Sequence, residues 1–120
     1  MKKFIIDRLT WLRGEGSDKS RLYRPSDGKM CCLGQIACQY GYTKEEISGR
    51  SSPFGMYSNE IPNKNKFYEK FAYVTLQGDN REMPGKMMEI NDDITLDSQS
   101  MENKLQALGL EMGIELEFIN

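Results

Sequence analysis

The three cysteines of this chain, Cys31, Cys32 and Cys38, lie within a segment of eight residues. An odd number of cysteines in one short segment is a poor disulfide framework. If a helix covers the segment, Cys31 and Cys38 lie about 10 Å apart along its axis, whereas a disulfide needs Cα atoms within about 7 Å. We therefore expect reduced, buried thiols, and a fold that depends on a hydrophobic core instead of covalent cross-links.

Histidine is absent from the sequence. This excludes Ser-His-Asp and Cys-His catalytic arrangements, because both need an imidazole base. It also excludes zinc sites that contain histidine, and three cysteines cannot complete a four-cysteine site. We expect no catalytic residue and no cofactor, and we favour a binding protein over an enzyme.

The length of 120 residues suits one domain spanning residues 1–120. The hydrophobic fraction of 38% and the charged fraction of 28% are typical of globular chains. No stretch approaches the roughly 20 apolar residues that cross a bilayer. The apolar run near the N-terminus meets Asp7 and Arg8 too early for a signal peptide. We predict a cytoplasmic protein without membrane contact.

Two helices are predicted in the first half of the chain. Apolar residues recur at helical spacing over residues 31–40, and Gly41 can end that helix. A second helix begins after Thr43, which acts as its N-cap with Glu46 as the capping-box partner. Residues 62–75 suit a helix and a strand equally well.

A third helix is predicted near the C-terminus. Methionine and leucine side chains over residues 101–112 recur at steps of four, three and four, which places them on one helix face. Asp97 or Ser98 can cap its N-terminus, and Gly113 stands where a left-handed residue ends a helix.

The chain ends are predicted to pair as strands. Residues 114–118 alternate strictly between apolar and acidic side chains, which indicates a half-buried strand. Its natural partner is the apolar segment 4–6, because a short strand needs a mate. The predicted fold class is α+β: a single small domain with two to four short helices packed on a small sheet that includes both chain ends.

Charge is distributed unevenly although the net charge is only −2. Residues 1–30 carry eight Lys or Arg and four Asp or Glu, whereas residues 81–120 carry three and nine. One interpretation is that the two ends pack together with complementary surface charges. The other is a basic patch for nucleic acid, or an acidic face that mimics nucleic acid.

The glycine-rich segment 14–17 and the cations that follow it form the first candidate ligand site. Backbone N–H groups of such a turn and nearby cations suit an anion, although the segment is not a Walker A loop. The alternative is an exposed turn with solvated charges. Cysteines at a helix start and a nearby tryptophan extend the site, since helix N-termini activate thiols and indole rings stack on bases. The candidate ligand-binding residues are Trp11, Arg13, Lys19, Arg21, Arg24, Asp27, Lys29, Cys31 and Cys32.

The acidic segment 89–97 is predicted to be a loop before the last helix. Oxygen-bearing side chains at Asn91, Asp93 and Asp97 have the spacing of a calcium loop, but Leu96 occupies the position that needs glycine. Turn formation and helix capping explain the same residues, and a weak divalent-ion site is the alternative.

Five blocks of sequence together resemble a known group. In order they are residues 11–16, residues 22–34 with the double-cysteine Cys-Cys-Leu-Gly motif, Gly41-Tyr42, the Ile-Asn-Asp-Asp segment 90–93, and residues 113–118. They resemble a group of small uncharacterised bacteriophage and prophage proteins, over most of the chain and most weakly over residues 50–85. The resemblance implies expression in the cytoplasm of a bacterial host and transfers no catalytic residue.

Three functional hypotheses follow. The first is a non-enzymatic phage accessory protein that binds a host protein or signalling molecule and counters a host defence. The second is a nucleotide-binding or nucleotide-processing protein. The third, and least favoured, is a nucleic-acid-binding module that uses the basic N-terminal third.

Overall fold

The computed structural model describes residues 2–13, 21–48 and 83–120. The elements in chain order are β1 (Lys2–Asp7), α1 (Cys32–Gln39), α2 (Lys44–Ile47), α4 (Met83–Asn91), α5 (Ser98–Glu111) and β2 (Ile114–Ile119). The fold is α+β, as predicted.

The two chain ends pair as parallel strands of one sheet. Lys2 lies opposite Ile114 and Asp7 lies opposite Ile119, so the whole of β1 is in register with β2. This confirms the predicted pairing of the termini. Alternate side chains point into the core, and the buried residues of the two strands are Phe4, Ile6, Ile114 and Leu116.

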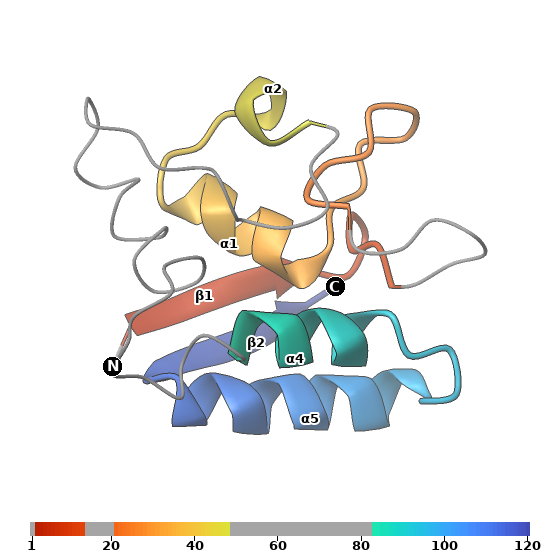
Figure 1. Ribbon diagram of the computed structural model, residues 1–120, viewed down its shortest axis with the longest axis vertical. Helices are drawn as coiled ribbons and strands as arrows, with labels where there is room; N and C mark the ends of the chain where they lie inside the picture. Colours follow the sequence, from red (N-terminus) through yellow and green to blue (C-terminus); the bar gives the residue numbers. More distant parts are fainter. Residues whose placement is uncertain (1, 14–20, 49–82) are drawn as a thin grey trace.

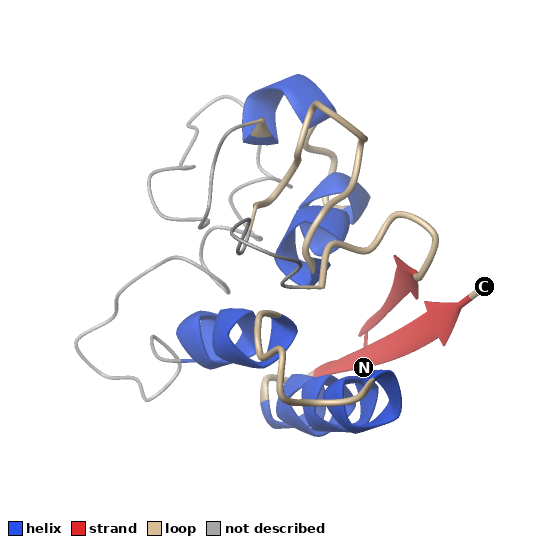
Figure 2. Cartoon of the chain, turned by 90° about the vertical axis from the view of Figure 1, so that its right-hand side faces the viewer, coloured by secondary structure: helices blue, strands red, loops and turns tan. Residues whose placement is uncertain are grey.

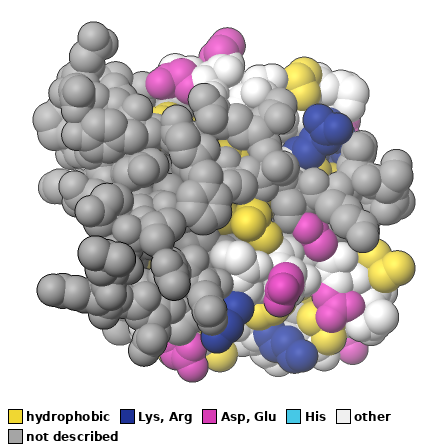
Figure 3. Space-filling model, in the orientation of Figure 1, with side chains coloured by type: hydrophobic (Ala, Val, Ile, Leu, Met, Phe, Trp, Pro, Cys, Tyr) yellow, Lys and Arg dark blue, Asp and Glu magenta, His cyan; other side chains and the backbone are white. Residues whose placement is uncertain are grey.

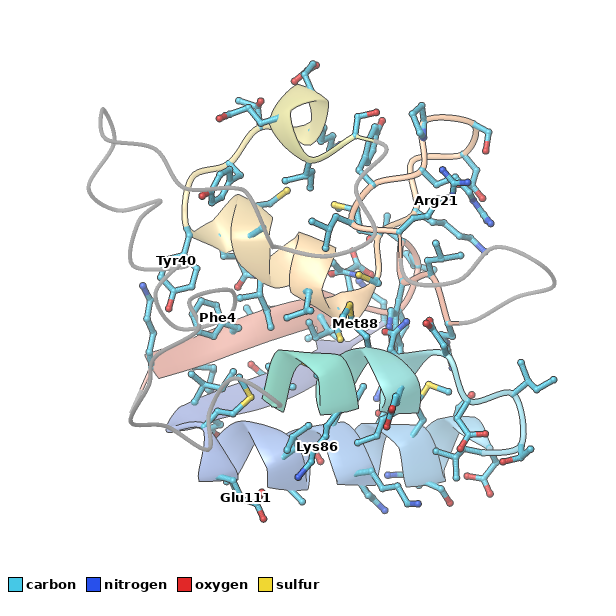
Figure 4. The ribbon with its side chains drawn as sticks, in the orientation of Figure 1. Phe4, Arg21, Tyr40, Lys86, Met88 and Glu111 are labelled. Carbon is cyan, nitrogen blue, oxygen red and sulfur yellow. The ribbon has the colours of Figure 1, made fainter. Side chains whose placement is uncertain are left out.

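The helices lie along and beside this two-stranded sheet. Helix α1 packs along β1, α5 packs along β2, and α4 contacts both helices. At the α1–β1 contact the rings of Phe4 and Tyr40 lie side by side, with centroids 5.2 Å apart (Figures 1 and 4). Figure 2 shows α4 on one side of the sheet and no described helix on the other side.

The predicted helix ends are confirmed. Gly41 follows α1 with φ of +105°, and Gly113 follows α5 with φ of +81°, a region that glycine enters without a Cβ clash. Thr43 and Glu46 form the predicted capping box of α2. Asp97, and not Ser98, caps α5, and its carboxylate accepts the Ser100 N–H at 2.7 Å.

Helix α4 extends into a segment that the sequence predicts as a loop. Residues 89–91, predicted as part of a loop, form the last turn of this helix. Its pattern is hidden because a polar residue, Asn91, occupies the buried position one turn after Met87. Pro84 does not prevent the helix, since it falls in the first turn, where no backbone N–H is needed.

Side chains of α1 cover the outer edge of β1. The Gln39 amide accepts the Ile5 N–H at 2.9 Å and donates to the Ile5 carbonyl at 2.8 Å. Gln35 accepts the Asp7 N–H at 2.7 Å and donates to the Asp7 carbonyl at 3.1 Å. The two glutamines thus take the place of a third strand.

The opposite charges of the chain ends meet across the fold, as the first interpretation of the charge asymmetry predicts. Arg8 donates two hydrogen bonds, of 2.8 and 2.7 Å, to the buried carboxylate of Glu102. On the surface, the Lys3 ammonium lies 3.6 Å from a carboxylate oxygen of Glu117.

Two predictions fall outside the described residues: the glycine-rich segment 14–17 and the ambiguous segment 62–75. Within the described part of the chain, no helix is long and apolar enough to cross a membrane.

Candidate functional site

An open pocket of about 400 Å³ lies where the chain leaving β1 meets Lys29 and the α4–α5 connection. Three cations and one carboxylate stand among its lining side chains. The lining residues are Arg8, Trp11, Arg13, Lys29, Asp93, Ile94, Leu96, Ser98 and Met101. The pocket therefore has a positive lining, which favours an anionic ligand.

Backbone hydrogen bonds bring residues 10–12 beside Met30. Leu12 N–H donates to the Met30 carbonyl and Met30 N–H donates to the Thr10 carbonyl, both at 2.8 Å. This parallel bridge lies between Trp11 and Met30. It brings Arg13, two residues after Trp11, and Lys29, directly before Met30, to the same pocket.

A tight turn before Lys29 sets the direction in which this residue approaches the pocket. Arg24 and Lys29 form an antiparallel bridge across the turn at residues 25–28, and Gly28 takes the positive φ of +74° that the turn requires. The chain then enters α1 directly after this bridge.

Asn91, at the end of α4, links Trp11, Leu12 and Cys32 by side-chain hydrogen bonds. Its side-chain oxygen accepts the Trp11 indole N–H at 2.7 Å and the Cys32 backbone N–H at 3.1 Å. Its amide nitrogen donates to the Leu12 carbonyl at 2.9 Å. Asn91 is fully buried, and its hydrogen bond positions Trp11, which lines the pocket.

Trp11 is covered on both sides. The Arg13 guanidinium carbon lies 4.6 Å from the ring centroid, and the Phe118 ring lies 5.0 Å away. Only 1% of Trp11 is exposed. The predicted stacking of a base on this indole therefore has no free ring face.

The cations of the pocket have defined partners. The hydrogen bonds that Arg8 donates to the Glu102 carboxylate raise the pKa of Arg8 and hold its guanidinium at the pocket edge. Arg13 donates to the hydroxyl of Ser98 in the first turn of α5. Arg13 therefore reaches the start of this fourteen-residue helix, whose first turn is already capped by the Asp97 carboxylate.

The three side chains considered for a divalent ion already have hydrogen-bond partners within the protein. Besides Asn91, Asp93 accepts the Thr95 hydroxyl and N–H, which lowers the pKa of its carboxyl. Asp97 caps α5, and the Ser100 N–H lowers its pKa likewise. Among the described residues there is no group of three His, Cys, Asp or Glu side chains that could hold a metal ion.

Cys31 and Cys32 lie beneath the pocket and not in its lining. Both are fully buried free thiols, with Cys31 at the N-cap of α1. Burial raises the pKa of Cys31 to about 12 and that of Cys32 well above its usual range. Loss of hydration thus outweighs the helix N-terminus, which would lower the pKa of an exposed thiol.

The remaining predicted ligand residues lie elsewhere. Arg24 and Asp27 form an ion pair within the turn, which lowers the pKa of Asp27 to about 2. Arg21 is exposed and projects outward, as Figure 4 shows, and it does not line the pocket. Lys19 lies outside the described residues.

Sequence reasoning missed several residues of this pocket. Arg8, Ile94, Ser98 and Met101 join Trp11, Arg13 and Lys29 only through tertiary contacts. No local pattern marks Arg8, because its partner Glu102 is 94 residues away.

No protein-family model, curated protein or solved structure matches this chain.

Proposed function

We propose that this protein is a non-enzymatic phage accessory protein that acts in the bacterial cytoplasm by binding a host component. The component that suits its pocket is a small anionic signalling molecule, with a phosphate group as the anion. Sequestering such a molecule would counter a host defence that depends on it.

The observation that carries this proposal is the grouping of three cations around one pocket. Arg8, Arg13 and Lys29 come from two separate segments and meet around one open pocket. Arginine and lysine side chains that converge on one site are common partners of phosphate. Ile94 and Leu96 supply apolar surface at the same rim, on which the uncharged part of a nucleotide could lie.

A binding role is favoured over catalysis by the chemistry of the chain. No imidazole exists to act as a base, and the thiols of Cys31 and Cys32 are buried with raised pKa values. The thiolate is the nucleophile in thiol catalysis, and burial keeps both groups protonated.

A nucleic-acid-binding role has less support. Lys3, Arg8 and Arg24 of the basic N-terminal third each pair with a carboxylate. On the described part of the face in Figure 3, Lys and Arg side chains are interspersed with Asp and Glu. A strand of phosphates would need a continuous basic path.

The test is a titration of the full chain with inorganic phosphate, pyrophosphate and a set of adenine and guanine nucleotides. We expect at least one of them to raise the melting temperature, because a ligand that binds only the folded state stabilises it. Lys29→Gln should weaken its binding by about tenfold, the usual effect of losing one charged hydrogen bond.

The control is Lys86→Gln, which removes the same charge from the exposed surface of α4 outside the pocket. This variant should bind like the original chain. A flat titration with every ligand, or equal losses for Lys29→Gln and Lys86→Gln, would count against the pocket as the site.

A further inference from the structure

The face of the sheet opposite α4 carries no described covering element (Figure 2). The strand register places six side chains there, three from each strand, and we call them the open sheet face. They are Lys3, Ile5 and Asp7 from β1, and Glu115, Glu117 and Ile119 from β2.

A face that no described element covers is unusual for parallel strands. Parallel sheets occur almost only where helices cover both faces, because their strands are apolar on both sides. Here Ile5 and Ile119 remain 41% and 37% exposed. Ile119 pairs with Asp7, and Ile5 pairs with Glu117, so the two isoleucines are diagonal neighbours across the strands. Diagonal neighbours are close enough to form one apolar contact surface.

The charges around these isoleucines are mainly negative. The open sheet face carries three carboxylates and one ammonium group, that of Lys3, which already pairs with Glu117. A groove of about 320 Å³ continues the face toward α5. It is lined by Lys3, Arg8, Gln99, Glu102, Gln106, Glu115, Leu116, Glu117 and Phe118.

A second copy of this chain is a poor occupant. Stacking two open sheet faces would bring Asp7, Glu115 and Glu117 of both copies into one interface. Carboxylates that lose water against other carboxylates are costly, and like charges at an interface disfavour the pairing. The face therefore fits a surface of opposite charge with an apolar centre.

We propose that the open sheet face docks a basic amphipathic helix of a partner protein. Leucine-type side chains of that helix cover Ile5 and Ile119, and its Lys or Arg side chains pair with Glu115 and Glu117. The partner helix thereby supplies the second cover that parallel strands normally have within one chain. None of the six side chains of the open sheet face lines the anion pocket, although the adjoining groove shares Arg8 with it.

The probe is a synthetic helical peptide of leucine and lysine, with the leucines on one face, titrated into the full chain. Backbone amide chemical shifts and calorimetry follow the binding. The comparison peptides are the leucine–glutamate version and a scrambled leucine–lysine sequence without an apolar face. We expect binding of the first peptide only, with the largest shifts in β1 and β2.

Two sets of variants test the site. Ile5→Thr with Ile119→Thr keeps β-branched residues in the strands and should weaken binding by about tenfold, as expected for two lost apolar contacts. Glu115→Lys should weaken peptide binding more at low salt than at high salt. The matched controls are Leu110→Gln and Glu111→Lys in exposed positions of α5, and both should leave the affinity unchanged.

Several results would overturn the proposal. These are equal binding of the amphipathic and scrambled peptides, equal binding of the glutamate version, or unchanged affinity in the Ile5→Thr, Ile119→Thr variant with an unchanged circular dichroism spectrum. A dimer in sedimentation equilibrium that Ile119→Thr dissociates would assign the face to a second copy instead. Loss of nucleotide binding in the Lys29→Gln variant would not affect the peptide result, so the two proposals fail separately.

Discussion

At the scale of single residues, the closest backbone approach in the Cys-Cys-Leu-Gly motif is at Gly34. A Cβ added there would lie 1.8 Å from the Leu22 carbonyl oxygen and 2.9 Å from the Leu22 Cα. Both neighbours are backbone atoms, so no side chain can rotate away. We expect Gly34→Ala to lower the free energy of unfolding by about 3 kcal/mol or more, at the upper end of overpacking effects. Urea unfolding measures this change.

The matched control for this substitution is Gly85→Ala in α4. A Cβ at Gly85 would meet nothing within 4 Å. Alanine should therefore stabilise the protein by about 0.5–1 kcal/mol, because it restricts the unfolded chain and favours a helix. Equal effects of the two substitutions would show that α1 can move away from Leu22.

The buried thiol of Cys31 makes stability depend on alkaline pH. The unfolded chain releases this proton near the ordinary pKa of about 9, whereas the folded chain holds it to about 12. The unfolded state thus binds fewer protons between these values, and the free energy of unfolding falls as pH rises through this window.

Cys31→Ala should flatten this alkaline decline in urea unfolding measured at successive pH values. Other groups that titrate in the same range are shared by both proteins and cancel in the comparison. Cys38→Ala is the control, since Cys38 is only partly buried. An unchanged slope in the Cys31→Ala variant would contradict the predicted role of this thiol.

At the scale of the elements, the geometry of α1 matches that of the strand beside it. Residues four apart in a helix are separated by about 6 Å, and residues two apart in a strand by about 6.6 Å. Gln35 and Gln39 are therefore spaced to reach Asp7 and Ile5 with their side-chain amides. This contact protects the edge of β1 from pairing with another chain.

We expect Gln39→Ala to lower the free energy of unfolding by about 1 kcal/mol, the usual net value of such hydrogen bonds. Amide hydrogen exchange should accelerate at Ile5 in Gln39→Ala and at Asp7 in Gln35→Ala. Gln99→Ala, which removes an exposed glutamine bonded to Asn103 within α5, is the control and should affect neither amide. Faster exchange at both amides in every variant would indicate general loosening instead of edge protection.

The elements with local signals could be predicted from the sequence. The caps at Thr43 and Asp97, the glycines at 41 and 113, and the alternation in β2 depend on neighbouring residues only. Helix α4 could not be predicted, because its buried face includes Asn91, whose partners Trp11 and Leu12 are 80 and 79 residues away.

The candidate pocket was predictable only in part for the same reason. Trp11, Arg13 and Lys29 lie near one another in sequence, and their charge pointed to an anion. Their meeting with Ser98 depends on how α5 packs, which no local pattern specifies. The burial of Cys31 and Cys32 follows from the number and spacing of the cysteines, whereas no sequence pattern indicates that Phe118 covers Trp11.

At the scale of the whole molecule, the fold joins a basic N-terminal segment to an acidic C-terminal one. The parallel pairing of β1 and β2 brings residues 2–7 of the first segment beside residues 114–119 of the second. The resulting ion pairs differ in burial. Lys3 and Glu117 are about half exposed, at 49% and 48%, whereas Glu102 is 7% exposed beside Arg8. Only the second pair should contribute clearly to stability, because water screens the first.

This difference predicts an asymmetric double-mutant cycle. Arg8→Met leaves the Glu102 carboxylate buried without its partner, so this change should destabilise the protein more than Glu102→Leu does. Adding Glu102→Leu to Arg8→Met should then restore much of the loss, since an apolar pair needs no compensation. The parallel cycle of Lys3→Met and Glu117→Leu should show additive effects within about 0–1 kcal/mol. Urea unfolding at low and high salt measures both cycles, and additivity at Arg8 and Glu102 would show that the buried pair does not join the two ends of the chain.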